Sequence, residues 1–161
     1  MTMLKPALAY RVELEHKFAE EIYSERYYYY IGHPHIHQLP QIDDTNDCYR
    51  WAIVDDDKVV GFLSYYIDGL LDSVTSFGLY SFDEGNPVVG IDLFNELERL
   101  VKLYHRIEWR VIEGNPVIRH YDKFCEMHGG NKVTLHDCTK SMSGEYRDEY
   151  IYEILSPKGD Q

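Results

Sequence analysis

The strongest structural signal in the chain is a pattern that occurs twice, as VTSFGLYSFDEGNPVVG at residues 74–90 and as IEWRVIEGNPVIRHYDKFCEMHGG at residues 107–130. Each copy is an apolar run, then Glu-Gly-Asn-Pro-Val, then a helical pattern. Glycine relaxes the backbone, asparagine caps free N–H groups, and proline fits the first helical turn because its missing N–H costs nothing there. Each pentapeptide therefore predicts the end of a strand and the start of a helix, capped by Asn86 or by Asn115.

The period of the apolar residues supports both helices. The first has an apolar face of Val89, Leu93, Leu97, Leu100 and Val101, with Asp92, Glu96, Arg99 and Lys102 lying elsewhere. The second has an apolar face of Val117, Ile118, Tyr121, Phe124, Cys125 and His128, and it ends at Gly129-Gly130. Strand, helix, strand and helix with short connections predict a right-handed crossover between adjacent parallel strands.

This arrangement has a consequence for ligand binding. Both helices would begin at the carboxyl ends of adjacent parallel strands, where open α/β sheets bind ligands. Two helix starts that face one crevice suit an anionic group such as a phosphate. The alternative is that Gly-Asn-Pro is only capping chemistry, worth about 1 kcal/mol per helix. Both interpretations stay open at the level of sequence.

Length and charge restrict the classes of function. The chain has 161 residues, of which 44% are hydrophobic and 27% charged, as in an ordinary globular domain. We expect one domain over residues 1–161, with residues 155–161 as a disordered tail. The formal net charge of −12 repels phosphate backbones and anionic lipid, so we expect no nucleic-acid or membrane partner. It suits a cationic substrate or a basic partner, although acidity can also serve solubility alone.

The cysteines bear on the compartment. Cys48, Cys125 and Cys138 are odd in number and widely spaced, which indicates reduced thiols and no zinc cluster. The chain contains no run of eighteen apolar residues, and its amino terminus lacks an apolar secretory core. We therefore expect a cytoplasmic protein that is a monomer or a homodimer.

The amino-terminal part predicts a helix and then a tyrosine cluster. The helix is indicated by apolar residues every four positions, at Tyr10, Leu14, Phe18 and Ile22. It leads into a run of four tyrosines at residues 27–30, in a chain with 15 tyrosines. Tyrosine has a large apolar face and a polar tip, so the run can line a pocket or an interface. Both uses stay open.

Three histidines follow, at His33, His35 and His37. In an extended segment they would share one face and could bind a transition metal. Pro34 and Pro40 favour a loop instead, and we predict a loop without a metal. Beyond it, residues 49–54 and 59–67 predict a hairpin with its turn at 55–58, and residues 132–137 and 146–155 predict a second one.

Three local sequences and the order of the elements together indicate a family. The sequences are WAIVDDDKVVGFL at 51–63, LFNELERL at 93–100 and VIEGNPVIRHY at 111–121. The order is helix, antiparallel hairpin, strand, helix, strand, helix and hairpin. Over residues 49–155 the chain resembles the GNAT superfamily of N-acetyltransferases. The resemblance implies an α/β fold with a GNAT-like mixed twisted sheet, a central parallel strand pair, helices on both faces and antiparallel hairpins at both ends.

The resemblance also implies acetyl-CoA as co-substrate and a set of site residues. In the family the pantetheine arm pairs with the backbone of the fourth strand, here Leu79, Tyr80 and Ser81. The pyrophosphate rests on the loop and helix start that follow, here Gly85, Asn86, Val88, Val89 and Gly90. Asn115 matches an asparagine found in many members. Tyr121 matches, one residue early, the tyrosine that protonates the departing thiolate.

The cofactor loop departs from the family pattern, which is glutamine or arginine, two residues, glycine, one residue and glycine. Gly85 stands at the basic or amide position and Val88 at the first glycine, so only Gly90 fits. Asp83 and Glu84 precede the loop, and like charge near a pyrophosphate costs binding unless both side chains point to solvent.

We therefore expect an acetyl-CoA-dependent N-acetyltransferase that acts on a small-molecule or peptide amine. Glu84 and Glu113 are candidate bases at strand ends, although placement near a helix start explains both. The three histidines are further candidates because they titrate in the right range. The alternative is a catalytically inactive GNAT-fold protein that binds a partner through an acidic, tyrosine-rich surface. Binding of CoA separates the two.

Overall fold

The computed structural model describes residues 3–157. Within them, seven strands form one sheet in the order β1-β2-β3-β4-β5-β7-β6. The strands are β1 (Met3–Pro6), β2 (Cys48–Asp55), β3 (Lys58–Asp68), β4 (Ser73–Ser81), β5 (Arg106–Ile112), β6 (Asn131–Lys140) and β7 (Tyr146–Leu155). The helices are η1 (Ala7–Tyr10), α1 (Arg11–Glu21), α2 (Glu25–Ile31), α3 (Pro87–Leu103) and α4 (Ile118–Met127).

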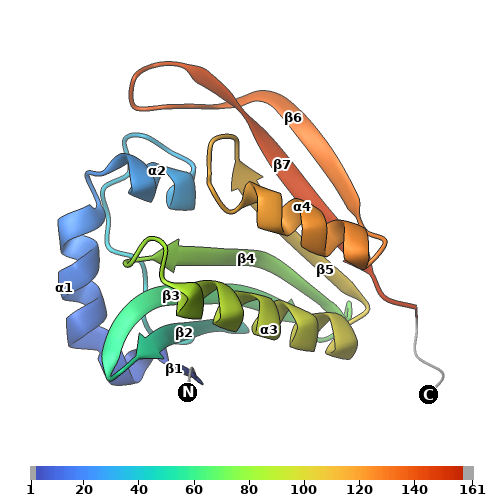
Figure 1. The fold of residues 1–161 in the computed structure, drawn as a ribbon, viewed down its shortest axis with the longest axis horizontal. Helices are drawn as coiled ribbons and strands as arrows, with labels where there is room; N and C mark the ends of the chain where they lie inside the picture. The colour runs from blue at the N-terminus through green and yellow to red at the C-terminus, as the bar shows by residue number, and fades with distance from the viewer. Residues whose placement is uncertain (1–2, 158–161) are drawn as a thin grey trace.

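The centre of the sheet is the parallel pair β4 and β5, and the other neighbouring strands are antiparallel. This confirms the predicted mixed α/β sheet with a central parallel pair and antiparallel hairpins at both ends. The pairing of β4 with β5 begins at Ser73 and Arg106 and ends at Phe77 and Trp109. An irregularity lies between Val74 and Phe77, where Ser76 has a φ of 55°. Beyond it the two strands diverge toward their carboxyl ends (Figure 1).

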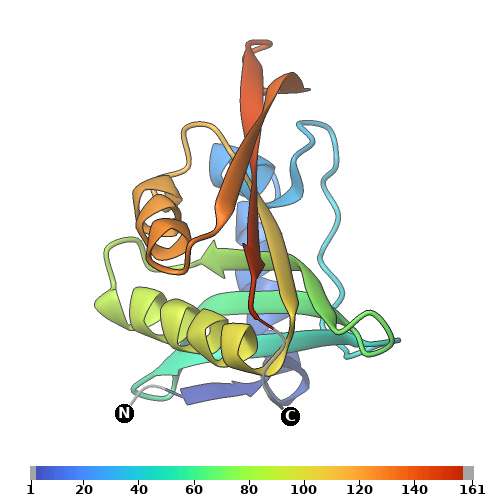
Figure 2. The same cartoon turned by 90° about the vertical axis from the view of Figure 1, so that its right-hand side faces the viewer.

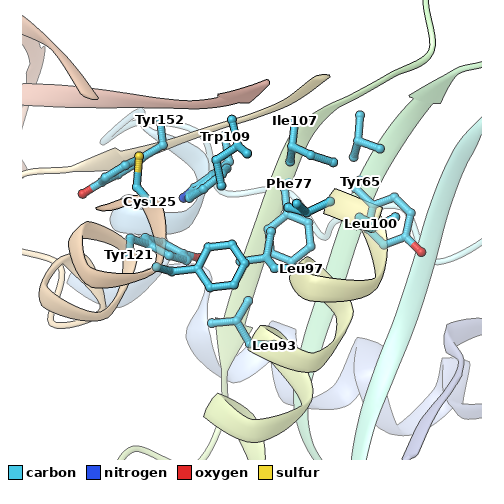
Figure 3. Close-up of a cluster of buried hydrophobic side chains, with 14 of the residues drawn as sticks. Tyr65, Phe77, Leu93, Leu97, Leu100, Ile107, Trp109, Tyr121, Cys125 and Tyr152 are labelled. Atoms are coloured by element: carbon cyan, nitrogen blue, oxygen red, sulfur yellow. The ribbon is translucent and has the colours of Figure 1, made fainter. Parts of the chain in front are cut away.

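Helices cover both faces of the sheet, as predicted (Figure 2). On one face, α3 and α4 pack against β5 and β7, and Figure 3 shows the buried side chains between them. Trp109 lies at the centre of this core and stacks on Tyr152, with 5.1 Å between the ring centroids. On the other face, Phe18 of α1 and Tyr27 of α2 pack against Phe62 of β3. The predicted apolar faces of both repeated helices are confirmed, because their central residues are buried.

The two pentapeptides form nearly the same turn but differ in where the helix starts. Gly85 and Gly114 both have positive φ, 81° and 97°, which glycine adopts without strain. Asn86 is the N-cap of α3, and its Oδ1 accepts from the N–H of Val88 at 2.9 Å.

At the second junction the predicted cap is wrong. Asn115 Oδ1 accepts from the N–H of Val117 at 3.1 Å, but α4 begins only at Ile118, with Val117 as its N-cap. The reason is an intervening turn, in which the N–H of Ile118 donates to the carbonyl of Asn115 at 3.1 Å before α-helical bonding begins. Asn115 therefore caps that turn, and the helix itself begins three residues later.

Several other elements extend the prediction. The strand β1 and the separate helix α2 are additions, and Ser24 caps α2 by accepting from the N–H of Tyr27 at 3.3 Å. The hairpin turn at 55–58 is confirmed, with positive φ at both Asp56 and Asp57. Asp92 and Glu96, both expected off the apolar face of α3, are buried. Tyr65 and Arg99 both donate to the carboxylate of Glu96 at 2.6 Å.

The predicted tail is described only in part. Leu155 closes β7, and the next residue, Ser156, donates from its N–H to the carbonyl of His105 at 2.8 Å. Residues 158–161 of that tail, and residues 1–2 of the predicted domain, lie outside the described residues. Among residues 3–157, no helix combines the length and the apolar composition of a membrane span.

Candidate active site

The divergence of β4 and β5 opens a cleft of about 1060 Å³ at the carboxyl ends of the two strands. Its walls come from both repeated units and from α2, which lies beyond the opening (Figure 1). All of the predicted site residues except Val88 line this one cleft: Leu79, Tyr80, Ser81, Gly85, Asn86, Val89, Gly90, Asn115 and Tyr121. Both pentapeptides follow the carboxyl ends of adjacent parallel strands and therefore lie at one place, which is where open α/β sheets bind ligands.

The wall made by β4 has a free strand edge. Leu79 and Tyr80 pair with Leu63 and Phe62 of β3 on one side. On the other side, within residues 3–157, the pairing of β4 with β5 does not extend past Phe77. Backbone polar groups at such an edge need a partner, which can be water or a ligand.

The start of α3 forms the next wall. A Cβ placed on Gly90 or on Gly85 would meet nothing within 4 Å, so the space next to both glycines is open. Val88 is different, because it packs in a small core with Ile53, Val60 and Val89. Its N–H is also occupied by the side chain of Asn86. Gly85, Asn86, Val89 and Gly90 thus line the cleft, whereas Val88 packs on the side away from it.

Three acidic side chains surround this helix start. Asn86 Nδ2 donates to Asp83 at 2.9 Å and to Asp55 at 3.3 Å, so one amide holds two carboxylates. The third is Glu84, whose Oε1 lies 3.3 Å from Nη1 of Arg26 in α2. The same guanidinium donates to the carbonyl of Ser81 at 3.2 Å and to Glu21 at 2.8 Å. A side chain from α2 therefore reaches across to the loop between β4 and α3.

Tyr121 lines the opposite wall, with its ring in the core and 3% of the residue exposed. The ring packs edge-on against Trp109, with ring centroids 5.6 Å apart (Figure 3). It also packs edge-on against Phe94, with centroids 6.1 Å apart. Burial raises the pKa of its hydroxyl, which keeps the proton on the oxygen at neutral pH. Within residues 3–157 that hydroxyl has no hydrogen-bond partner, whereas the neighbouring Tyr152 donates to Asp122 at 2.6 Å.

Comparison with known proteins identifies the fold. No family model and no curated protein matches the sequence. Among solved structures, the ribosomal-protein-S18-alanine N-acetyltransferase from Escherichia coli has a TM-score of 0.68 at 14% identity, over 100% of this chain and 98% of the other. A probable acetyltransferase of the GNAT family from Chromobacterium violaceum has a TM-score of 0.67 at 18% identity, over 99% and 90%. The chain has the GNAT fold. An N-acetyltransferase from Staphylococcus aureus Mu50 agrees, with a TM-score of 0.66 at 12% identity, over 98% and 99%.

On this GNAT fold, α2 is the element of the cleft that sequence reasoning did not place. It contributes Arg26, Tyr29 and Tyr30 to the lining. Tyr30 lies against Gly78 of β4, where an added Cβ would be 3.5 Å from the tyrosine ring. Tyr29 receives a hydrogen bond from Arg147 of β7 at 3.0 Å. The run of four tyrosines was the available signal, and its spacing on one short helix sends two of the rings into the core and two toward the cleft.

The candidate bases are less available than their positions suggested. Glu84 is paired with Arg26, and Glu113 Oε2 accepts from the N–H of Asp148 at 3.1 Å. His33 to His37 lie in a loop, as Pro34 and Pro40 predict. His33 accepts from the N–H of His35 at 3.1 Å, while His37 contacts the carbonyl of Ile22 at 2.8 Å. Across the described part of the chain, no three potential metal ligands come together.

Proposed function

We propose that this protein is an N-acetyltransferase that transfers the acetyl group of acetyl-CoA to an amine. The observation that carries the proposal is the free edge of β4, which has β3 on one side and the cleft on the other. A pantetheine arm is an extended chain with amide groups, so it can pair with a free strand edge as a peptide does. Leu79, Tyr80 and Ser81 would supply that edge, where the carbonyl of Ser81 already accepts a hydrogen bond from Arg26.

The start of α3 would bind the diphosphate end of the same acetyl-CoA molecule. Backbone N–H groups and the helix dipole favour an anion at this position. Gly85, Asn86, Val89 and Gly90 line the cleft, and the open space next to Gly90 leaves room for a phosphate group. Val88 is left out of the proposed contact set, because it does not line the cleft and its side chain packs against Ile53, Val60 and Val89.

The transfer forms a C–N bond and breaks the C–S bond of the thioester, so the amine nitrogen releases a proton to solvent and the departing thiolate takes one up. Acetyl-CoA supplies the acetyl thioester. Positioning of the uncharged amine beside it provides most of the acceleration in reactions of this kind. The Tyr121 hydroxyl keeps its proton and faces no protein partner in residues 3–157, so it can donate that proton to the departing thiolate. The Nδ2 atom of Asn115 is likewise free within the same residues, since only its Oδ1 is occupied.

We propose a basic amine as the acceptor. The E. coli protein with the same fold is described as acting on the alanine of a ribosomal protein. A net charge of −12 attracts cationic molecules over long range, which favours a basic small molecule or a basic peptide as the amine. The three free cysteines fit a cytoplasmic enzyme.

A specific observation favours a second candidate, a protein of this fold that binds a partner and has lost the chemistry. Asp55 and Asp83 are held beside the start of α3 by Asn86, and no basic residue stands at Gly85. Negative charge at this place opposes an anionic ligand. The acidic surface and its tyrosines would then serve protein binding.

Calorimetric titration with CoA tests the proposal. Wild type should bind, and Gly90→Glu should abolish binding because a long anionic side chain enters the open space next to the helix start. Leu103→Glu is the matched control, since it adds the same charge to an exposed position on α3 about 20 Å away at 1.5 Å per residue. It should bind as wild type does. Thermal melting of each variant checks that the fold is intact.

A neutralised variant separates the two candidates. Asp83→Asn combined with Glu84→Gln should tighten CoA binding, because it removes like charge from the anion site. If neither wild type nor this variant binds CoA at millimolar concentration, the enzyme proposal fails and the partner-binding protein replaces it. If both bind, release of free thiol from acetyl-CoA should be measured against basic, neutral and acidic amines.

A further inference from the structure

The wall of the cleft formed by β4 and α3 carries no cation of its own. From Val59 to Glu98 the sequence contains no lysine or arginine, although it contains Asp83 and Glu84 beside the helix start. Asp83 has the side-chain amide of Asn86 as a donor. Glu84 has Arg26 as its ion-pair partner, at 3.3 Å. The charge balance at this wall therefore depends on one residue of α2.

Arg26 is placed so that it can offset negative charge at this wall. Its side chain is 33% exposed, and its guanidinium contacts the carbonyl of Ser81 and the carboxylates of Glu84 and Glu21. Glu21 has two further donors, the hydroxyls of Tyr80 at 2.8 Å and Ser24 at 3.2 Å. Glu84 is 67% exposed, and within residues 3–157 Arg26 is its one basic partner. Loss of Arg26 would thus leave Glu21 with hydrogen bonds but leave Glu84 uncompensated.

We infer that Arg26 is the cation beside the start of α3 in the acetyl-donor site, acting through Glu84, whereas Arg110 lines the same cleft from β5. Arg26 offsets the charge of Glu84 next to the start of α3, so that an anionic diphosphate can lie at the positive end of the α3 dipole. This inference rests on the proposed function, since it assumes that the cleft takes CoA. The basic charge that the loop sequence lacks at Gly85 comes instead from a residue 59 positions earlier in the chain, brought there by the packing of α2.

Two different roles for Arg26 predict different behaviour of a double variant. If Arg26 acts by charge, Arg26→Gln weakens CoA binding because Glu84 is exposed to the diphosphate, and Glu84→Gln in the same molecule restores it. If Arg26 only anchors α2 to Ser81 and Glu21, the removal of Glu84 restores nothing. Glu84→Gln alone should tighten binding, because the charge of Arg26 then faces the ligand without a competitor.

The experiment is calorimetric titration of CoA into wild type, R26Q, E84Q, R26Q/E84Q and R26K. R26Q should bind about tenfold more weakly than wild type, and the double variant should bind at least as tightly as wild type. R26K should keep most of the affinity, because it keeps the charge. The loss in R26Q should be larger at about 0.01 M salt than at about 1 M, where the Debye length is ~3 Å instead of ~30 Å. R106Q is the matched control, since Arg106 pairs with Glu108 and Glu153 at the other end of β5.

The outcomes separate this inference from the proposed function. No CoA binding by folded wild type overturns both. Binding by wild type with equal affinity in R26Q, or with a double variant as weak as R26Q, overturns the role of Arg26 and leaves the acetyltransferase proposal standing. If R26Q does not fold, E84Q and R26K decide, since weaker binding by E84Q contradicts the charge role. Restoration in R26Q/E84Q, together with the salt dependence, supports it.

Discussion

The Nη1 atom of Arg147 lies 3.0 Å from the hydroxyl of Tyr29, and this contact joins the last strand to α2 across the end of the cleft. The same atom donates to the carbonyl of Glu113 at 3.3 Å. Helix α2 is thereby tied to both pentapeptides, to Glu84 through Arg26 and to Glu113 through Arg147. Contacts with distant parts of the chain therefore hold this seven-residue helix beside both pentapeptides.

Removal of this link should lower stability in proportion to the bonds lost. Arg147→Met loses its bonds to Tyr29 and to Glu113, and we expect a loss of about 2 kcal/mol in the free energy of unfolding, since bonds to charged groups are worth ~1.5–3 kcal/mol. Tyr29→Phe loses one bond and should cost about 1 kcal/mol. Urea denaturation measures both, with Arg110→Met as a control at the exposed position of β5, which lines the cleft. Full additivity of the two substitutions would contradict the link, because variants that share a bond must couple.

Glycine substitutions should show how tightly the second pentapeptide is enclosed. Gly114 has a φ of 97°, and an added Cβ would lie 2.5 Å from Arg147 Nη1 and 2.7 Å from Tyr29 Oη. Gly114→Ala should cost about 2–3 kcal/mol from backbone strain and steric conflict together. Gly85→Ala, with positive φ but open space, should cost about 1 kcal/mol. Gly69→Ala has neither feature and should stay within about 0.5 kcal/mol of wild type. Equal melting temperatures for G114A and G69A would show that Tyr29 and Arg147 do not pack closely against Gly114 in solution.

The centre of the fold could be predicted because its signals are local. Periodic apolar residues and the capping chemistry of Glu-Gly-Asn-Pro-Val act over a few positions, so they identified β4, α3, β5 and α4 in order. The same local view misplaced the start of α4, since Asn115 and Asn86 have the same neighbours in sequence. The surroundings of the two junctions differ, since Gly114 lies against Tyr29 and Arg147 from distant segments, whereas an added Cβ on Gly85 would meet nothing within 4 Å.

The charges of the site could not be predicted in the same way. Arg26 reaches the carbonyl of Ser81 across 55 positions, and Arg147 reaches Tyr29 across 118. No periodicity encodes such contacts, because they arise from the docking of α2. The burial of Glu96 was missed partly for the same reason, since its donor Tyr65 becomes a partner only when β3 packs under α3. Its other donor, Arg99, lies three residues further along the same helix. One signal was available, the absence of lysine and arginine between Val59 and Glu98, which points to a cation from outside that stretch.

Removal of the hydroxyl should affect catalysis at Tyr121 and stability at the neighbouring Tyr152. The Tyr121 hydroxyl has no partner within residues 3–157, whereas the Tyr152 hydroxyl donates to Asp122 at 2.6 Å. Tyr121→Phe should keep the free energy of unfolding within about 0.5 kcal/mol of wild type. If Tyr121 protonates the departing thiolate, kcat should fall by about 100-fold with little change in KM. Tyr152→Phe should instead lose about 1.5 kcal/mol of stability. Unchanged kcat in Y121F would remove Tyr121 from the proposed mechanism.

The acid sensitivity of the fold should reside partly in Asp122. Burial raises the pKa of its carboxyl, but hydrogen bonds from Lys132 at 2.8 Å and Tyr152 at 2.6 Å outweigh burial and lower that pKa below its ordinary value. A carboxylate with a lowered folded-state pKa contributes stability above the unfolded-state value, about 3.9, and loses it as the pH falls through the folded-state value.

Asp122→Asn should therefore reduce the free energy of unfolding at neutral pH, and the difference from wild type should shrink as the pH falls below about 4. The side chain is 44% exposed, so solvent screening limits the contribution to about 1 kcal/mol. Glu126→Gln is the control, because it removes a carboxylate from an exposed position of the same helix. Urea denaturation between neutral pH and about pH 3 measures the difference. A gap between D122N and wild type that stays constant over this range would mean that the substitution acts through packing, because only a titrating carboxylate loses its contribution in acid.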